Sequence, residues 1–160
     1  KKINNHKMIT KEEVLSEQKQ WSVGLLNIGK LYSESADYKQ AAANYLSELY
    51  GFHMGEVFFK PTLAFVQQFR LTKEAALSYF VGGNSNFDED SGFALLGWKA
   101  VRFENIGVKI EENIAIAMGN YFFQKEDKSE VKVEYTFVYK KDDFGKLYII
   151  VHDSHFPYDS

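Results

Sequence analysis

Residues 146–158 read Lys-Leu-Tyr-Ile-Ile-Val-His-Asp-Ser-His-Phe-Pro-Tyr, and this closing segment decides the fold class. Its β-branched and aromatic residues predict a β-strand, which ends in side chains able to exchange protons. Alternation along a strand predicts one face made of Tyr148, Ile150, His152 and Ser154, and another made of Leu147, Ile149, Val151 and Asp153. One face of a core strand therefore carries both an imidazole and a hydroxyl.

Three long strand-like runs precede this segment, over residues 99–109, 114–124 and 131–140. The segment Asp142-Asp143-Phe144-Gly145 supplies the last hairpin turn. A shorter run over residues 57–62 contains Pro61, which lacks an amide hydrogen and so predicts a strand at the sheet edge. Consecutive long strands joined by short turns indicate a mainly antiparallel sheet.

Helical signals occupy the first half of the chain. Thr10 and Glu13 have the spacing of a capping box, and an apolar stripe follows at Val14, Trp21, Leu25, Ile28 and Tyr32. A second helix is expected from Tyr38 to Gly51, and a third from Thr72 to Val81. Helices followed by antiparallel strands predict an α+β fold, with helices on one face of a curved sheet and a pocket between them.

Composition limits the classes of protein. A length of 160 residues fits one domain, 1–160, in which we expect residues 1–9 to be a flexible leader or linker remnant. The lack of cysteine excludes a disulfide framework, thiolate zinc sites and a cysteine nucleophile. A net charge of −3 disfavours nucleic acid as a partner, and no apolar run is long enough to span a membrane. Composition leaves the cellular compartment open.

His152 with Ser154 is the best chemical pair, because a neutral imidazole accepts a proton from water or a hydroxyl. A histidine at a strand end is more often structural than catalytic, so the pair alone does not define a function. Arg102 and Glu104 share a strand face and could orient an anionic substrate, although a surface ion pair is the commoner role. The tyrosines Tyr121, Tyr135, Tyr139 and Tyr148 could line a cavity, with core packing the commoner role.

The histidines do not predict a metal site. Of His6, His53, His152 and His155, only the last two are close in sequence, and a separation of three residues puts them on opposite strand faces. Asp153 and His155 share the face away from His152.

Several segments together resemble the iota-class carbonic anhydrases, a family once grouped with the association domain of calcium/calmodulin-dependent protein kinase II. The resemblance runs from Trp21 to Tyr158. Its distinctive segments are Gly24-Leu25-Leu26-Asn27-Ile28-Gly29-Lys30, Phe59-Lys60-Pro61-Thr62-Leu63-Ala64, Phe69-Arg70-Leu71-Thr72, Ser78-Tyr79-Phe80, Val101-Arg102-Phe103-Glu104-Asn105, Ala117-Met118-Gly119-Asn120-Tyr121, Val133-Glu134-Tyr135-Thr136-Phe137 and the closing His-Asp-Ser-His-Phe-Pro-Tyr.

This resemblance implies a cone-shaped fold like nuclear transport factor 2, a homodimer, and reversible hydration of carbon dioxide to bicarbonate and a proton. The matching pocket residues are Thr62, Tyr79, His152 and Ser154; we expect Thr62, Tyr79, Ser154 and Arg102 to contact substrate. The family includes enzymes that work without a metal and others described with manganese or zinc. The resemblance leads us to expect the metal-free form for this chain. A chloroplast location in an alga, or a periplasmic one in a bacterium, would be typical of the family.

One departure and two alternatives accompany this interpretation. The family tail commonly reads His-His-Ser-Ser-x-Pro-Tyr, whereas this chain has Asp153 and His155 at the second and fourth positions. Alternation predicts that both face away from the pocket. The alternatives are a non-catalytic association module and a ketosteroid-isomerase-like enzyme, which would need Glu104 or Glu134 as a base inside the pocket.

Overall fold

A computed structural model describes residues 8–160, which form three α-helices and a five-stranded sheet. The helices are α1 (Lys11–Ser33), α2 (Tyr38–Leu49) and α3 (Lys73–Val81). The capping box at Thr10 and the cap at Thr72 are both present, which confirms the predicted starts of α1 and α3. Within the described residues, no helix is long and apolar enough to cross a membrane.

The stripe of α1 is buried as predicted at Val14, Trp21, Leu25 and Ile28. The prediction that Tyr32 belongs to the buried stripe is wrong, because 47% of its surface is exposed. In the last turn of α1 its ring packs instead at 5.0 Å on that of Tyr38, across the short connection to α2.

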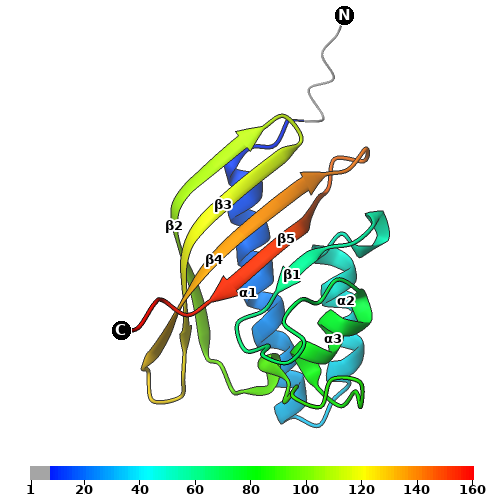
Figure 1. The fold of residues 1–160 in the computed structure, drawn as a ribbon, viewed down its shortest axis with the longest axis vertical. Helices are drawn as coiled ribbons and strands as arrows, with labels where there is room; N and C mark the ends of the chain where they lie inside the picture. Colours follow the sequence, from blue (N-terminus) through cyan, green and yellow to red (C-terminus); the bar gives the residue numbers. More distant parts are fainter. Residues whose placement is uncertain (1–7) are drawn as a thin grey trace, which may run out of the picture.

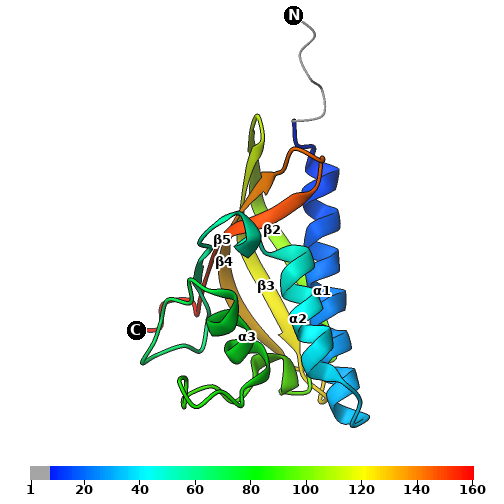
Figure 2. The ribbon, with the colours of Figure 1, turned by 90° about the vertical axis from the view of Figure 1, so that its right-hand side faces the viewer.

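The strands are β1 (Phe58–Lys60), β2 (Ala100–Glu111), β3 (Ile114–Gln124), β4 (Glu130–Lys141) and β5 (Leu147–His155). They lie in the order β1-β5-β4-β3-β2, with β1 parallel to β5 and the other pairs antiparallel (Figure 1). The predicted α+β class and the edge position of β1 are confirmed. Helices α1 and α2 lie along one face of the curved sheet (Figure 2).

A β-bulge in β5 changes which of its side chains face the helices. Val151 pairs with Val138 of β4, but the next pair is Ile149 with Tyr139, so Ile150 is an extra residue. Because the bulge shifts the alternation by one residue, Leu147 and Ile149 are buried on the same face as His152 and Ser154. The predicted shared face of Tyr148 and Ile150 with His152 is therefore wrong, whereas the pairing of His152 with Ser154 is confirmed.

Most of the expected leader, residues 1–7, lies outside the described residues. Ile9 is buried, and its amide donates to the Glu112 carbonyl at 3.1 Å. This contact ties residue 9 to the loop between β2 and β3.

Candidate active site

His152 lies on β5, on the inner face of the sheet that the helices cover. Its neighbours across the sheet are Phe59 on β1 and Phe137 on β4, whose rings stack on the imidazole at centroid distances of 4.9 and 4.0 Å. Only 2% of His152 is exposed. Burial between two apolar rings disfavours the charged form and lowers the pKa of His152 from 6.5 to about 3. The imidazole is therefore neutral at physiological pH.

Two tyrosine hydroxyls hold the two ring nitrogens of His152. The Tyr50 hydroxyl lies 2.9 Å from Nδ1, and the Tyr121 hydroxyl lies 3.1 Å from Nε2. Trp21 donates its indole N–H to the Tyr50 hydroxyl at 2.9 Å. With both nitrogens engaged, His152 has no free lone pair to offer a metal ion.

A chain of hydroxyls leads from Tyr121 toward the opening of the site. Tyr121 and Ser154 are joined by a 2.5 Å hydrogen bond, as are Ser154 and Thr62. Ser154 faces inward because it lies two residues beyond His152 on β5, and Thr62 follows Pro61 at the end of β1. The two strands therefore deliver one hydroxyl each to the same point.

Tyr79 approaches this point from α3. Its hydroxyl accepts a hydrogen bond from the Leu63 amide at 3.3 Å, and its ring stacks on Phe93 at 5.5 Å. Burial is the largest influence on its hydroxyl and raises the pKa of Tyr79, as it does for Tyr121, so both phenols stay protonated. A cavity of about 10 Å³, which has room for roughly one water molecule, lies at this point. The residues around it include Thr62, Tyr79, Tyr121, His152 and Ser154.

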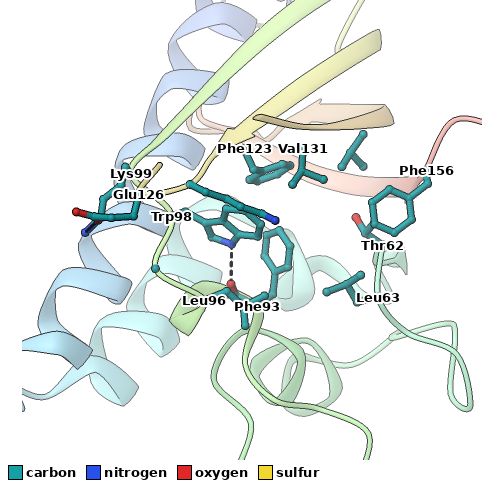
Figure 3. A pocket seen from close by; sticks show the side chains of 13 residues that line it. Thr62, Leu63, Phe93, Leu96, Trp98, Lys99, Phe123, Glu126, Val131 and Phe156 are labelled. Carbon is teal, nitrogen blue, oxygen red and sulfur yellow. Dashed lines mark hydrogen bonds and ion pairs between the residues drawn. The ribbon is translucent and has the colours of Figure 1, made fainter. Parts of the chain in front are cut away.

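A larger apolar space, here called the vestibule, connects Thr62 to the surface (Figure 3). Its volume is about 570 Å³, and its walls include Phe93, Trp98, Phe123, Val131 and Phe156. The Trp98 indole is held by a 2.9 Å hydrogen bond to the Phe93 carbonyl. An ion pair between Lys99 and Glu126 lies at its rim. A small apolar molecule can thus approach the hydroxyl cluster along mainly apolar walls.

The loop that carries Thr62 is fastened by acidic side chains from the segment after α3. The Glu89 carboxylate accepts hydrogen bonds from the backbone amides of residues 65, 66 and 67, and these hydrogen bonds lower the pKa of its carboxyl. Arg70 is completely buried and forms a two-pronged ion pair with Asp90. Asp90 also accepts from Ser78 on α3. These contacts hold the end of β1 against the helix that bears Tyr79.

The model of the family described as metal-independent carbonic anhydrase matches residues 12–156. A metal-independent carbonic anhydrase from Nostoc sp. is 40% identical over 157 residues, which is 96% of this chain and 77% of the relative. The chain belongs to the metal-independent carbonic anhydrase family. This membership confirms the resemblance drawn from the sequence.

Solved structures agree with this membership. The crystal structure of a cyanobacterial iota-carbonic anhydrase, complexed with bicarbonate, is 39% identical and has a TM-score of 0.95, covering 100% of this chain and 99% of its own. A putative dehydratase of the NTF2-like family from Streptomyces avermitilis is only 9% identical, with a TM-score of 0.55 over 92% of this chain and 96% of its own. The second likeness shows the fold alone, which is NTF2-like as expected.

Among the site residues expected for this metal-independent carbonic anhydrase family member, Thr62, Tyr79, His152 and Ser154 lie together as described above. Arg102 does not join them. Its guanidinium bonds Glu130 at 2.9 Å and Glu104 at 2.6 Å and lies over the Phe122 ring on the outer sheet face. The residues on either side of Arg102, Val101 and Phe103, are the ones packed against the core. The surface ion pair weighed for Arg102 is confirmed, and the expected substrate contact has no support.

The acidic residues considered from the sequence also lie on the outer face. Glu104 pairs with Arg102, and Glu134 lies 2.8 Å from His155. His155 is also 3.7 Å from Asp153, so the two departures from the family tail share the face away from His152, as alternation predicts.

Two further tyrosines, Tyr121 and Tyr50, bond the site histidine. The sequence allows Tyr121 to line a cavity, with core packing as its commoner role, and it offers no signal for Tyr50. Tyr121 alternates with Phe123 on the buried face of β3, which gives it the same pattern as an ordinary core residue. Tyr50 follows the last residue of α2 and lies 102 positions from His152, so no local pattern links them.

Proposed function

We propose that this chain catalyses the reversible hydration of carbon dioxide to bicarbonate and a proton, without a metal. The observation that carries the proposal is a hydrogen-bonded group around a water-sized cavity, made of Thr62, Tyr79, Tyr121, His152 and Ser154. Thr62 also borders the apolar vestibule. Family membership supports the same activity.

The reaction joins the oxygen of a water molecule to the carbon of carbon dioxide. One pair of electrons of a carbon–oxygen double bond moves to its oxygen, and the water loses a proton. Because the substrate is apolar, the vestibule admits it at low cost. Because the oxygen gains negative charge as the bond forms, hydroxyl donors fixed beside the cavity stabilise the transition state more than the substrate.

Each group has a role that follows from its position. Ser154 and Thr62 are held by bonds of 2.5 Å, so their hydrogens are already oriented before substrate arrives. Tyr79 accepts from the Leu63 amide and is hydrogen-bonded to Thr62, so its hydroxyl is fixed beside the cavity. His152 is neutral and buried, so we assign it the orienting of hydroxyls and not the uptake of the proton.

The deciding experiment is a stopped-flow carbon dioxide hydration assay with a pH indicator, before and after exhaustive chelation, with metal content measured on the same sample. We expect folded, metal-stripped protein to keep its activity. Activity lost on chelation and restored by one ion would overturn the metal-free mechanism. Absence of hydration in folded protein would overturn the proposed function.

The isomerase alternative receives no support from the geometry. Proton transfer next to a carbonyl needs a carboxylate base in the pocket. The side chains of Glu104 and Glu134 are 56% and 41% exposed and paired on the outer sheet face.

We further propose that the chain forms a homodimer through the outer face of its sheet. Met118 on β3 and Ile106 at the β2 bulge are 52% and 84% exposed there, which is unfavourable in water unless covered. Light scattering coupled to size exclusion is expected to give the mass of a dimer, and Met118→Lys to shift it toward monomer. A monomeric wild-type chain at micromolar concentration would contradict this assembly.

A further inference from the structure

The hydrogen bonds behind His152 have a direction that their chemistry determines. Trp21 is the starting point, because an indole N–H donates and never accepts. It donates to the Tyr50 hydroxyl oxygen at 2.9 Å. The Tyr50 hydroxyl therefore uses its oxygen toward Trp21 and has one hydrogen left to place.

That hydrogen has one acceptor among the contacts of Tyr50, namely Nδ1 of His152 at 2.9 Å. Tyr50 is fully buried, and its other ring neighbours are the apolar rings of Phe52, Phe59 and Phe80. If His152 carried its hydrogen on Nδ1, the Tyr50 hydrogen would be buried without an acceptor, which proteins avoid. The contacts therefore favour the imidazole tautomer with its hydrogen on Nε2.

The same reasoning continues on the other side of the ring. Nε2–H donates to the Tyr121 hydroxyl at 3.1 Å, so Tyr121 in turn donates to Ser154 at 2.5 Å. Ser154 then donates to Thr62 at 2.5 Å. The chain ends at Thr62, whose side chain borders both the small cavity and the vestibule. At this end Thr62 is also hydrogen-bonded to Tyr79, so one hydrogen of these two hydroxyls remains for a ligand.

We infer that Trp21 and Tyr50 are positioning residues that lock the tautomer of His152 and thereby set the direction of the whole hydroxyl chain. This inference rests on the proposed function for its catalytic meaning. The locked direction makes the chain a donor to the substrate oxygen that gains charge. It also prevents the chain from taking the proton of the attacking water, because accepting it would require every hydroxyl to reverse and Nε2 to lose its hydrogen. That proton leaves through the vestibule to solvent or buffer.

The tautomer can be measured directly from the ring nitrogens. A chain in which His6, His53 and His155 are replaced by glutamine keeps His152 as its single histidine. In the ¹⁵N-labelled protein we expect an unprotonated Nδ1 and a protonated Nε2, unchanged from about pH 6 to about pH 9. Introducing Tyr50→Phe removes the donor to Nδ1 and is expected to shift the signals toward the other tautomer.

Tyr45→Phe is the matched control. Tyr45 is also a buried tyrosine, and its hydroxyl donates to the backbone carbonyl of Trp21 at 3.0 Å. The described contacts include no hydrogen bond between Tyr45 and His152. We expect its removal to leave the His152 signals unchanged. A proton on Nδ1 in the parent protein, or identical signals in the Tyr50→Phe and Tyr45→Phe variants, would overturn the inference.

Kinetics supply the second measurement. Tyr50→Phe should lower the kcat of carbon dioxide hydration by about tenfold or more with little change in KM, because the vestibule is untouched and only donor orientation is lost. A Tyr50→Phe enzyme as fast as Tyr45→Phe would overturn the inference. The tautomer of His152 can be measured whether or not the protein is active. Wild-type protein that is inactive but protonated at Nε2 would overturn the proposed function and would still support the inferred direction of the hydrogen bonds.

Discussion

Replacing Ser154 by alanine removes the hydroxyl that joins the inner and outer parts of the site. Its oxygen bonds both Tyr121 and Thr62 at 2.5 Å, and only 1% of the residue is exposed. The substitution therefore leaves Tyr121 without its acceptor and Thr62 without its donor. The volume removed is one oxygen atom, so the surrounding rings stay in place.

Two magnitudes follow from this loss. Without Ser154 the hydroxyl of Thr62 is no longer oriented. Losing one preorganised donor to a developing oxyanion typically lowers kcat by about 10²–10³-fold, and we expect about 100-fold here. Leaving a buried polar group without its partner costs about 1–3 kcal/mol of folding free energy. For a chain of this length that corresponds to a decrease in Tm of roughly 2–12 °C.

The assay is stopped-flow hydration of carbon dioxide on protein whose folding is verified by circular dichroism. Ser22→Ala is the control, since Ser22 is also buried and its hydroxyl donates to the Gln18 carbonyl at 3.2 Å, outside the site. We expect the control to keep its rate. A folded Ser154→Ala enzyme with a rate equal to that of the control would refute the role of the hydroxyl chain.

Four further predictions concern the site and its surroundings. Tyr79→Phe keeps the ring that stacks on Phe93 but loses the donor, so kcat should fall about tenfold or more; an unchanged rate would remove Tyr79 from the mechanism. Because the pKa of His152 is lowered to about 3, the folded state resists a proton that the unfolded chain binds below pH 6.5. Stability should therefore fall by up to about 1.4 kcal/mol per pH unit between pH 6.5 and 3, and urea unfolding that is flat over this range would contradict it. Glu17 is unpaired at Oε2 and its pKa is raised to about 7 by burial, so the stability it contributes is present below pH 4.5 and is lost as pH rises through 7. Glu17→Gln should then be more stable than wild type by roughly 1–2 kcal/mol at about pH 8.5, allowing for partial exposure, and equal stability would argue against a buried charge. Asp153→His combined with His155→Ser should change activity less than about twofold, because both side chains lie on the outer face; a large change would show that this face affects the site.

Local signals were sufficient for most of the elements. The capping residues Thr10 and Thr72 mark helix starts because their hydroxyls satisfy amides within the next turn, which needs no tertiary contact. The bounds of β3 were predicted to the residue, since both its turns lie close in sequence. Family resemblance, in turn, located Thr62, Tyr79, His152 and Ser154.

Features that depend on a partner strand or on distant contacts were not predictable. The bulge at Ile150 exists only because β4 offers one residue fewer than β5 across their ladder. The role of Tyr50 depends on a hydrogen bond to a histidine 102 positions away. Arg102 was ambiguous because alternation shows that it shares a face with Glu104, but not whether that face is covered by helices.

The rings around His152 enclose neutral groups only, and the fold explains why. A charged group between the rings of Phe59 and Phe137 would cost several kcal/mol, a large part of the roughly 5–15 kcal/mol that keeps a domain folded. The ion pair of Arg102 with Glu130 and the contact of His155 with Glu134 lie on the outer face, and the groups around His152 are neutral and hydrogen-bonded to one another. Such a network can stabilise an oxygen that gains charge, but it cannot store a proton, so water and the open vestibule must carry the proton away.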